Sequence, residues 1–246
     1  MTRTIRIYQQ GHFHLQQELR LSEEAGQHVG IVLRKKIGDR LVVFSGDNRE
    51  WDAEIISAHK KKVTVCLLTE RLLSRESPRI IRLAQAISKG ERMEWLIQKA
   101  VELGVHAIYP IVTQHAAYKM DEARLDKKFE QWQAIAISAC EQCGRNQVPL
   151  IARAQMLSEY LESSFLATPN VNYVLDPYSG KSLRSFDTPP AEISLMIGPE
   201  GGFHDTEISM LQEKNFQSLS LGPRILRTET AAMTALSVVQ AAWGDL

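Results

Sequence analysis

The segment Ile193-Ser-Leu-Met-Ile-Gly-Pro-Glu-Gly-Gly202 joins a short apolar run to a glycine-rich loop, and a helical pattern follows over Asp205–Lys214. In open α/β sheets, ligands bind in the crevice beyond the C-terminal ends of the strands. The two glycines after Glu200 permit positive φ and a close approach of the backbone to a ligand. The loop therefore predicts a ligand site, with an ordinary strand-to-helix loop as the alternative. Its spacing matches neither the dinucleotide-binding pattern nor the P-loop.

A second loop, Leu221-Gly-Pro-Arg-Ile-Leu-Arg-Thr-Glu-Thr-Ala231, also lies between an expected strand and an expected helix. Thr228 is a suitable N-cap, and Glu229 in the first turn complements the helix dipole. Capping does not explain why two arginines stand in this loop. Arginine suits phosphate recognition or the stabilisation of developing negative charge. A simple ion pair between Arg227 and Glu229 is the alternative interpretation of Arg227.

Around these loops, short apolar strands alternate with helices of about ten residues or more, which predicts a mostly parallel sheet with helices on both faces. The expected strands are Ile80–Ile87, His106–Val112, Val171–Leu175, Ile193–Ile197 and Gln217–Leu221. The expected helices are Glu91–Leu103, Glu122–Cys140, Asp205–Lys214 and Glu229–Trp243.

The N-terminal part of the chain is instead rich in short β-type runs, which predict a small barrel or sandwich. The expected strands are Thr4–Tyr8, Arg40–Phe44, Trp51–Ser57 and Val63–Thr69, with a hairpin over Leu41–Ile56 and one helix over Ser22–Leu33 capped by Ser22. The polar stretch Ser74-Arg-Glu-Ser-Pro78 marks a boundary. We therefore expect two domains, residues 1–73 and 74–246.

The composition is that of an ordinary globular protein: 246 residues, 44% hydrophobic and 24% charged. No apolar run approaches the roughly 18 residues of a membrane span, and the N-terminus lacks the apolar region of a secretory signal. Three cysteines do not indicate a disulfide framework. The cytoplasm is the expected compartment, without membrane contact.

The charge is distributed unevenly along the chain, although the formal net charge is zero. Residues 1–82 hold 15 Lys and Arg against 10 Asp and Glu, which gives a net charge of +5. Residues 83–246 hold the other 14 Lys and Arg against 19 Asp and Glu, which gives −5. This asymmetry favours a first domain that approaches phosphates, with solvated surfaces as the alternative. The candidate RNA-binding residues are Arg34, Lys35, Lys36, Lys60, Lys61 and Lys62.

Two short patterns contain pairs of metal-binding residue types, but neither pair is enough for a metal site. Cys140-Glu-Gln-Cys143 offers two of the four ligands that a structural zinc needs and ends a helix. His12-Phe-His14 is a chelating pair only where a third ligand lies nearby on a strand. Surface histidines, or histidines that face RNA, are the alternative, and we expect no metal.

Five motifs carry a family resemblance. Two are the loops Gly198-Pro-Glu-Gly-Gly202 and Leu221–Ala231. The others are Ser88-Lys-Gly-Glu-Arg-Met-Glu-Trp-Leu-Ile-Gln-Lys-Ala-Val-Glu-Leu-Gly-Val105, Glu141-Gln-Cys-Gly-Arg-Asn-Gln-Val-Pro149, and His28-Val-Gly-Ile-Val-Leu-Arg34 with Ile37-Gly-Asp39 and Phe44-Ser-Gly46. In these motifs, which span nearly the whole chain, the sequence resembles the 16S ribosomal RNA uridine N3-methyltransferase family of the SPOUT superfamily. One position departs from the family pattern. His204 stands where the family usually has a serine, and we expect Asp205 to cap the helix instead.

The resemblance implies a trefoil-knotted SPOUT methyltransferase domain, a rare exception to the avoidance of knots, preceded by a small β-barrel of the PUA-like, RNA-binding kind. It implies S-adenosylmethionine as cofactor, a homodimer whose subunits complete the site, and 16S ribosomal RNA within the small subunit as substrate. Leu175-Asp-Pro177 would close the donor pocket. The residues implied to bind the donor are Leu175, Gly198, Glu200, Gly201, Gly202, Leu221, Gly222, Ile225, Leu226, Arg227, Thr228 and Ala231.

The chemistry indicates which side chains such an enzyme needs. Uracil N3 becomes a good nucleophile only as its proton leaves, so the site must stabilise a uridine anion and align it with the donor methyl. Arg227 is the first candidate for this role and Arg145 the second. Glu200 and Glu229 are the candidate proton acceptors, although a carboxylate is a weak base for this step.

Two other functions remain open from the sequence. A SPOUT ribose 2′-O-methyltransferase would carry an asparagine in a Ser-Leu-Asn context at the start of the last helix, where this chain has Arg227-Thr-Glu-Thr. A non-catalytic, RNA-binding ribosome-assembly factor is the other alternative, and donor binding separates it from an enzyme.

Overall fold

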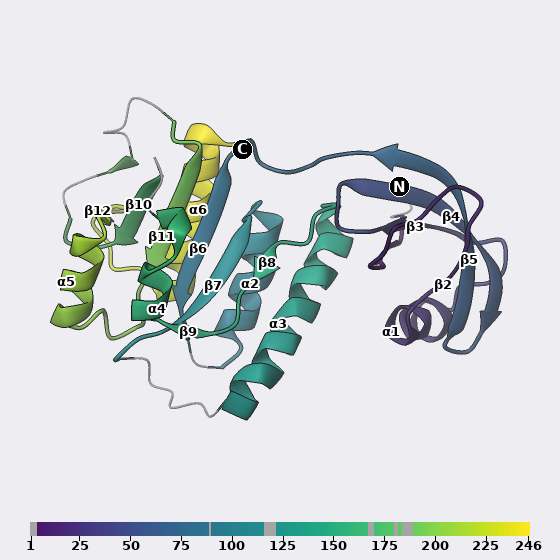
Figure 1. Ribbon diagram of the computed structural model, residues 1–246, viewed down its shortest axis with the longest axis horizontal. Coiled ribbons are helices and arrows are strands. Elements are labelled where there is room, and N and C mark those ends of the chain that lie inside the picture. The colour runs from purple at the N-terminus through teal and green to yellow at the C-terminus, as the bar shows by residue number, and fades with distance from the viewer. Residues whose placement is uncertain (1–3, 89, 116–121, 167–169, 180–181, 184–188) are drawn as a thin grey trace. The chain divides into compact units, whose positions relative to one another are not determined.

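The computed structural model describes residues 4–88, 90–115, 122–166, 170–179, 182–183 and 189–246 (Figure 1). The chain divides into two compact units, Met1–Glu76 with Cys140–Val148, and Ser77–Ala139 with Pro149–Leu246. The expected division at residue 73 therefore shifts by three residues. A larger correction concerns segment 140–148, which we assigned to the second domain and which packs in the first. Lys89, part of one family motif, lies outside the described residues.

The first unit is built on a five-stranded sheet in the order β1 (Arg6–Tyr8), β3 (Arg40–Phe44), β4 (Arg49–His59), β5 (Lys62–Leu72) and β2 (Glu18–Arg20). The β3–β4 and β4–β5 pairs are antiparallel, which confirms the expected hairpin, and β1 pairs with β3 in parallel. Alternate residues of β4 and β5 are buried in the core of this unit. Strand β2 was not predicted, because Glu-Leu-Arg carries no β-branched or aromatic residue.

One short helical segment covers this sheet. Helix α1 (Glu23–Gln27) continues into a π-helical turn, η1 (His28–Val32), and Ser22 Oγ accepts a hydrogen bond from Ala25 N at 3.2 Å, as expected for an N-cap. Gly26 and Gly30 lie directly on the β4–β5 turn. A Cβ at Gly26 would stand 2.0 Å from Lys61 O, and one at Gly30 would stand 2.2 Å from Lys60 O. Only glycine permits this approach.

The second unit contains a parallel sheet, as the alternation of strands and helices predicted. Its strand order is β12 (Gln217–Leu219), β10 (Val171–Leu175), β11 (Glu192–Ile197), β6 (Ile80–Ala86), β7 (Ala107–Val112) and β8 (Leu150–Ile151), and β9 (Gln155–Met156) also pairs with β7. Every pair among these strands is parallel. The carboxyl ends of β10, β11 and β12 therefore meet at one edge of the sheet.

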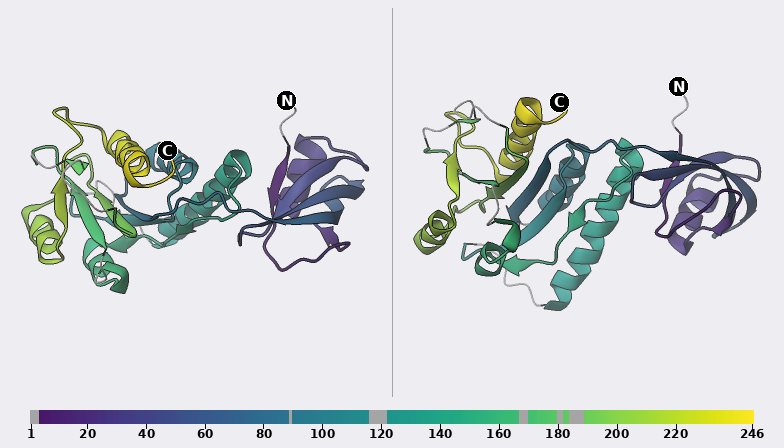
Figure 2. Two further views of the ribbon diagram at one scale, coloured as in Figure 1. Left: turned by 90° about the horizontal axis from the view of Figure 1, so that it is seen from above. Right: turned by 45° about the horizontal axis from the view of Figure 1, so that its top comes forward.

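Helices cover both faces of this sheet, also as expected (Figure 2). Gln85 on β6 bonds to Thr228 of α6 (Thr228–Trp243), and α6 packs against α2 (Arg92–Glu102). Ala84, the next residue along β6, belongs to the core beneath α4 (Leu157–Leu161) and α5 (Asp205–Glu213). Successive strand residues point to opposite faces, so the two helix pairs lie on opposite sides.

The remaining elements are α3 (Glu122–Cys143) and the short 3₁₀ turn η2 (Ser164–Leu166). Helix α3 is as predicted, with a C-terminal end three residues later than expected. The structure adds β8, β9, α4 and η2, which are too short for hydrophobic periodicity to reveal. No helix in the described part of the chain is long and apolar enough to cross a membrane.

Candidate active site

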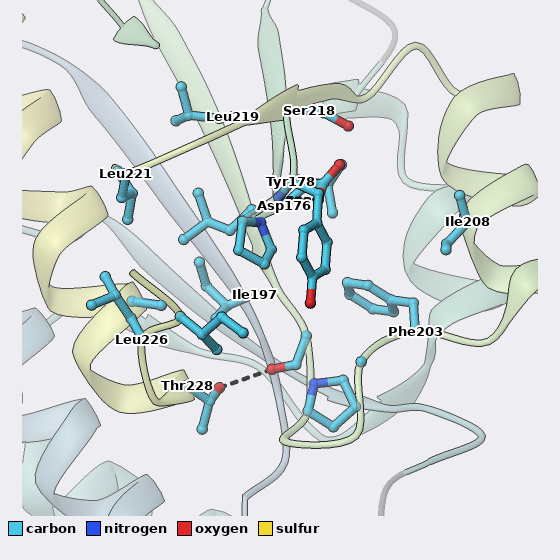
Figure 3. Close-up of a pocket in the computed structure, with 18 of the residues that line it drawn as sticks. Asp176, Tyr178, Ile197, Phe203, Ile208, Ser218, Leu219, Leu221, Leu226 and Thr228 are labelled. Carbon is cyan, nitrogen blue, oxygen red and sulfur yellow. Dashed lines mark hydrogen bonds between the residues drawn. The ribbon is translucent and has the colours of Figure 1, made fainter. Parts of the chain in front are cut away.

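A cavity of about 680 Å³, here called the main cavity, opens at the carboxyl ends of β10, β11 and β12 (Figure 3). The loops that follow these three strands form its walls, together with the start of α6. All twelve residues assigned to a donor pocket from the sequence line it: Leu175, Gly198, Glu200, Gly201, Gly202, Leu221, Gly222, Ile225, Leu226, Arg227, Thr228 and Ala231. The two glycine-containing loops therefore converge, as the position of each after a strand predicted.

The interior of the main cavity is mainly apolar, and it includes aromatic residues that sequence reasoning missed. Figure 3 shows the ring of Tyr178 beside that of Phe203, with Ile197 and Leu226 on the facing wall. Tyr178 is 84% exposed, so its ring stands at the opening. The sequence could have indicated Tyr178, because the Asp-Pro-Tyr turn follows strand β10 directly, just as the two glycine loops follow β11 and β12. Such a cavity suits a flat, largely apolar group.

A hydrogen-bond relay fixes the start of α6 against the loop after β11. Thr228 Oγ1 donates to Gly198 O at 2.8 Å and accepts from Gln85 Nε2 at 2.9 Å. The expectation that Thr228 caps α6 is therefore wrong. The N-cap position is Arg227, whose side chain makes no capping bond. The Thr228 hydroxyl instead bonds to Gln85 on β6 and to Gly198 after β11. The relay joins β6, β11 and α6 through one buried hydroxyl group.

The glycines of the main cavity are needed for different reasons. Gly202 and Gly222 have φ of +74° and +113°, where other residues are strained. A Cβ at Gly198 would come within 2.9 Å of the Phe203 ring. Gly201 shows neither constraint, since its nearest neighbour would be His115 Cβ at 3.5 Å, an ordinary contact. Of the two glycines after Glu200, only Gly202 uses the left-handed conformation.

Helix α5 begins differently from expectation. His204, not Asp205, occupies the N-cap position: its Nδ1 accepts from Thr206 N at 3.3 Å, while Glu207 Oε2 accepts from His204 N at 2.9 Å. The imidazole thus replaces the serine of the family pattern in a capping box. Glu207 is buried and also accepts from Gln114 N at 2.9 Å, which ties the segment after β7 to this helix.

Charged groups stand at two points of the main cavity. Asp176 Oδ1 accepts from Tyr178 N at 2.9 Å, which holds the turn after β10. Glu200, a candidate proton acceptor, is half-exposed and accepts from Arg92 Nη1 of α2 at 2.6 Å. Arg227 lines the cavity from an exposed position, and no ion pair joins it to Glu229 among the described residues. The structure therefore gives no support to the simple Arg227–Glu229 pair.

Arg145 is not part of this cavity. It lies in the first unit, is 4% exposed, and donates through Nε and Nη2 to Glu76. The neighbouring Asn146 is fully buried and donates to Glu50 Oε2 at 3.1 Å. These bonds give Arg145 a structural role in the first unit, and its assignment to catalysis stays a prediction.

Glu50 is the centre of this polar cluster. It is 3% exposed and accepts from Arg6 at 2.7 Å and Arg71 at 3.0 Å in addition to Asn146. Burial alone would raise the pKa of the Glu50 carboxyl, but these hydrogen bonds outweigh it and lower the pKa to about 2. We call Arg6, Glu50, Arg71, Asn146 and the Arg145–Glu76 pair the Glu50 network.

The six basic residues assigned to RNA binding lie at two places that α1 and η1 connect. Lys60–Lys62 form the β4–β5 turn, on which Gly26 and Gly30 pack, and Arg34–Lys36 follow η1 directly. Two of the lysines have acidic neighbours, because Lys61 pairs with Glu23 at 3.2 Å and Lys35 approaches Asp39 at 4.0 Å. Both pairs are exposed at the surface, where ion pairs are weak.

No metal centre accompanies these sites in the described ranges, where no group of three or more His, Cys, Asp or Glu residues could hold an ion. Cys140 and Cys143 are free thiols. Cys140 is buried in the first unit, and burial raises its pKa to about 12. At neutral pH this thiol stays protonated, which makes it a poor ligand and nucleophile.

A parallel sheet whose carboxyl ends open into one mainly apolar cavity, between two glycine-containing loops, defines a ligand-binding α/β domain. Residues 75–240 match the model of the RNA methyltransferase domain family, and residues 21–67 match that of the RNA methyltransferase PUA domain. The chain is 33% identical to ribosomal RNA small subunit methyltransferase E of Buchnera aphidicola, over 98% of this chain and 97% of that protein. The corresponding Bacillus subtilis protein is 33% identical over 89% of this chain and 88% of its own length.

Two solved structures resemble the whole chain. A methyltransferase from Legionella pneumophila with the cofactor SAM bound is 49% identical, covers 100% of both chains and superposes with a TM-score of 0.95. Ribosomal RNA small subunit methyltransferase E from Neisseria gonorrhoeae, bound to S-adenosyl methionine, is 34% identical, covers 99% of this chain and 100% of that chain, and has a TM-score of 0.92. The protein therefore belongs to the RNA methyltransferase family, in the group of ribosomal RNA small subunit methyltransferase E, which confirms the resemblance and the fold class drawn from the sequence motifs.

Proposed function

We propose that the protein transfers the methyl group of S-adenosylmethionine to N3 of a uridine in the 16S ribosomal RNA of the small subunit. The observation that carries this proposal is the main cavity, which collects all the residues that the family resemblance assigns to the donor. Whole-chain similarity to two structures with this cofactor bound supports the same identity of the ligand.

The residues of the main cavity fit such a donor. Tyr178, Phe203 and Leu226 supply apolar surface for an adenine ring. The Asp176 carboxylate suits ribose hydroxyl groups, since carboxylates accept two hydrogen bonds from a diol. Gly201 lines the main cavity without a side chain, which leaves its backbone open to the ligand. When bound, the donor supplies an electrophilic methyl group.

Arg227 is the residue that we assign to stabilising the uridine anion. It leads into α6 at the edge of the main cavity, exposed and without a capping bond. A guanidinium stays protonated and donates to the carbonyl oxygens on which the negative charge of the anion lies. Glu200 is a weaker candidate for proton acceptor than Glu229, because its carboxylate already accepts a hydrogen bond from Arg92.

The first unit would hold the RNA. Arg34–Lys36 and Lys60–Lys62 are connected by α1 and η1 and lie on the part of the chain with a net charge of +5. Cationic side chains on a small β domain neutralise phosphates without reading the sequence. This surface would add affinity, and the second unit would select the nucleotide.

Three further features belong to the proposal. We infer a homodimer, because Tyr178 and Ile225, 84% and 74% exposed, leave apolar surface at the mouth of the main cavity. We infer the trefoil knot of the SPOUT superfamily, because the chain returns from β12 at the sheet edge to α6, which packs on β11. We infer the cytoplasm as the compartment, because the proposed substrate is ribosomal RNA.

Calorimetry and methyl transfer test this function together. The purified protein is expected to bind S-adenosylmethionine with micromolar affinity and to label small subunits from a strain that lacks the gene. Nucleoside mass spectrometry of that RNA should show 3-methyluridine. A 2′-O-methylated nucleoside would identify the ribose enzyme instead, and an absence of donor binding would identify a non-catalytic RNA-binding factor.

A further inference from the structure

A second cavity, here called the side cavity, lies between the first turns of α2 and α6. Its volume is about 430 Å³, and it is lined by Glu91, Arg92, Trp95, Glu229 and Thr230. The side cavity adjoins the main cavity at two points. First, Arg92 of the side cavity bonds to Glu200 of the main cavity. Second, the start of α6 contributes to both: residues 227, 228 and 231 line the main cavity, and residues 229 and 230 line the side cavity. The start of α6 therefore borders both cavities.

Trp95 is an unusual side chain for this position. It is 46% exposed, whereas Trp51 and Trp132 are 1% exposed. The buried face of α2 consists of Met93, Leu96, Ile97, Ala100 and Val101, so Trp95 is not part of the core. An indole at the edge of a cavity offers a flat face on which a nucleobase can stack, and such stacking is tolerant of sequence.

Glu229 provides a second, independent observation. Its Oε2 is shielded from solvent and has no hydrogen-bond partner among the described residues. A shielded carboxylate oxygen without a donor is costly, and Glu229 lines the side cavity, so a small rotation of its side chain towards a donor in the cavity would remove this cost. Arg92 lies on the same wall. Its Nη1 bonds to Glu200, and a guanidinium has further N–H donors that suit a carbonyl oxygen.

We propose that the side cavity is the subsite for the acceptor base, an unpaired uracil stacked on Trp95, with Glu229 as acceptor of the N3 proton. Uracil presents one N–H between two carbonyl groups, which complements one carboxylate oxygen beside a guanidinium. This proposal rests on the proposed function and specifies its substrate subsite. Cytosine has no N3–H, so it could not donate to Glu229 at this position.

The transfer step then balances. The N3–H bond breaks as the proton passes to the Glu229 carboxylate, and the nitrogen electron pair forms the new N–C bond to the methyl carbon. The carbon–sulfur bond of the donor breaks, and its electron pair stays on sulfur, which becomes a neutral thioether. Arg227 lines the main cavity and Glu229 lines the side cavity, so we assign stabilisation of the anion to Arg227 and acceptance of the proton to Glu229.

Single-turnover methyl transfer to unmodified small subunits, at saturating S-adenosylmethionine, tests the subsite. Trp95→Ala should raise the RNA concentration for half-maximal rate about tenfold, and Trp95→Phe should recover most of the loss, because a phenyl ring still stacks. Glu229→Gln should lower the rate about 10²-fold near pH 7, the contribution of a general base. Its rate should then rise with pH, because the uracil must lose its proton to the solvent. Donor affinity by calorimetry should be unchanged.

The matched control is Glu102→Gln, which removes a carboxylate at the far end of α2, where it pairs with Lys99. It should behave as wild type in each assay. The subsite is overturned if wild type methylates the RNA and both Trp95→Ala and Glu229→Gln do so at wild-type rate and RNA dependence. It is also overturned if Trp95→Ala changes only the oligomeric state in sedimentation, which would make the cavity part of a subunit interface. Wild-type protein that transfers no methyl group overturns the proposed function itself, and the subsite with it.

Discussion

Arg227 and Arg145 were assigned to one catalytic site from the sequence, and the structure gives them opposite surroundings. Arg227 is exposed at the start of α6, lines the main cavity and makes no capping bond. Arg145 is 4% exposed in the first unit, and its guanidinium bonds to Glu76. Both belong to family motifs. The difference shows that membership of a family motif does not by itself place an arginine at the main cavity.

Replacement of Arg145 should give the largest effect, and it should be an effect on stability. Arg145→Ala leaves Glu76 without its buried partner, so the free energy of unfolding should fall by about 3–5 kcal/mol, measured by urea denaturation. Donor affinity of the folded protein should not change, because the main cavity lies in the second unit. The control is Arg153→Ala, whose pair with Asp126 is exposed and should contribute less than about 1 kcal/mol. A stable Arg145→Ala protein without methyl transfer would restore its catalytic role.

The Glu50 network should make the first unit sensitive to acid. The pKa of Glu50 is about 2 in the folded protein, below its ordinary value of 4.5, so its contribution is present above pH 4.5 and is lost as the pH falls towards 2. The difference corresponds to about 3 kcal/mol. Glu50→Gln should lower stability at neutral pH and flatten this acid limb in denaturation curves. Glu54→Gln, at an exposed pair with Arg40, should leave the pH profile intact.

Replacement of Arg227 should affect turnover and leave stability nearly unchanged. Arg227→Ala should lose about 2–4 kcal/mol of transition-state stabilisation, the range for a single oxyanion donor. Arg227→Lys should recover only part, because an ammonium group lacks the planar fork. Single-turnover rates at saturating donor, measured together with thermal melts, separate a catalytic role of Arg227 from a structural one. A melting temperature and donor affinity that fall together, with no specific loss of rate, would make Arg227 a structural residue like Arg145.

A glycine with space around it gives a direct test of the main cavity. Gly201→Val should fold normally, because the nearest neighbour of its Cβ would be His115 Cβ at 3.5 Å, an ordinary contact. It should weaken donor binding about tenfold or more in calorimetry, because the added methyl groups reduce the space at this wall of the main cavity. Gly202→Val, at φ +74°, should lose stability as well as affinity. If folded Gly201→Val binds S-adenosylmethionine as wild type does, the donor does not approach this loop.

The smallest expected effect concerns the basic surface of the first unit. Replacement of Lys60, Lys61 and Lys62 by alanine should weaken RNA binding across sequences and reduce its dependence on salt, because fewer counterions are released. Fluorescence anisotropy at several salt concentrations measures both quantities. Lys214→Ala, in the second unit, serves as the control. Unchanged affinity and an unchanged salt slope would show that this turn is not the RNA footprint.

The sequence determined the order of the elements and the membership of the main cavity. Hydrophobic periodicity located β10, β11, α2, α5 and α6 within a few residues. The glycine loops after β11 and β12 supplied most of the cavity residues, since strand ends in a parallel sheet meet at one edge. These signals are local in the chain, and the handedness and pairing rules of α/β folds convert them into positions in space.

The tertiary structure alone decided how the polar side chains are used. Thr228 does not cap α6, because its hydroxyl donates to Gly198 O on a loop distant in sequence. His204 caps α5 in place of the expected Asp205. Arg145 lies outside the main cavity, and its guanidinium bonds to Glu76, which is 69 residues away in the sequence. Trp95 and Glu229 share a cavity although α2 and α6 lie at opposite ends of the second unit's sequence. The sequence gives the type of each side chain, but which distant residue becomes its hydrogen-bond partner depends on how the chain folds.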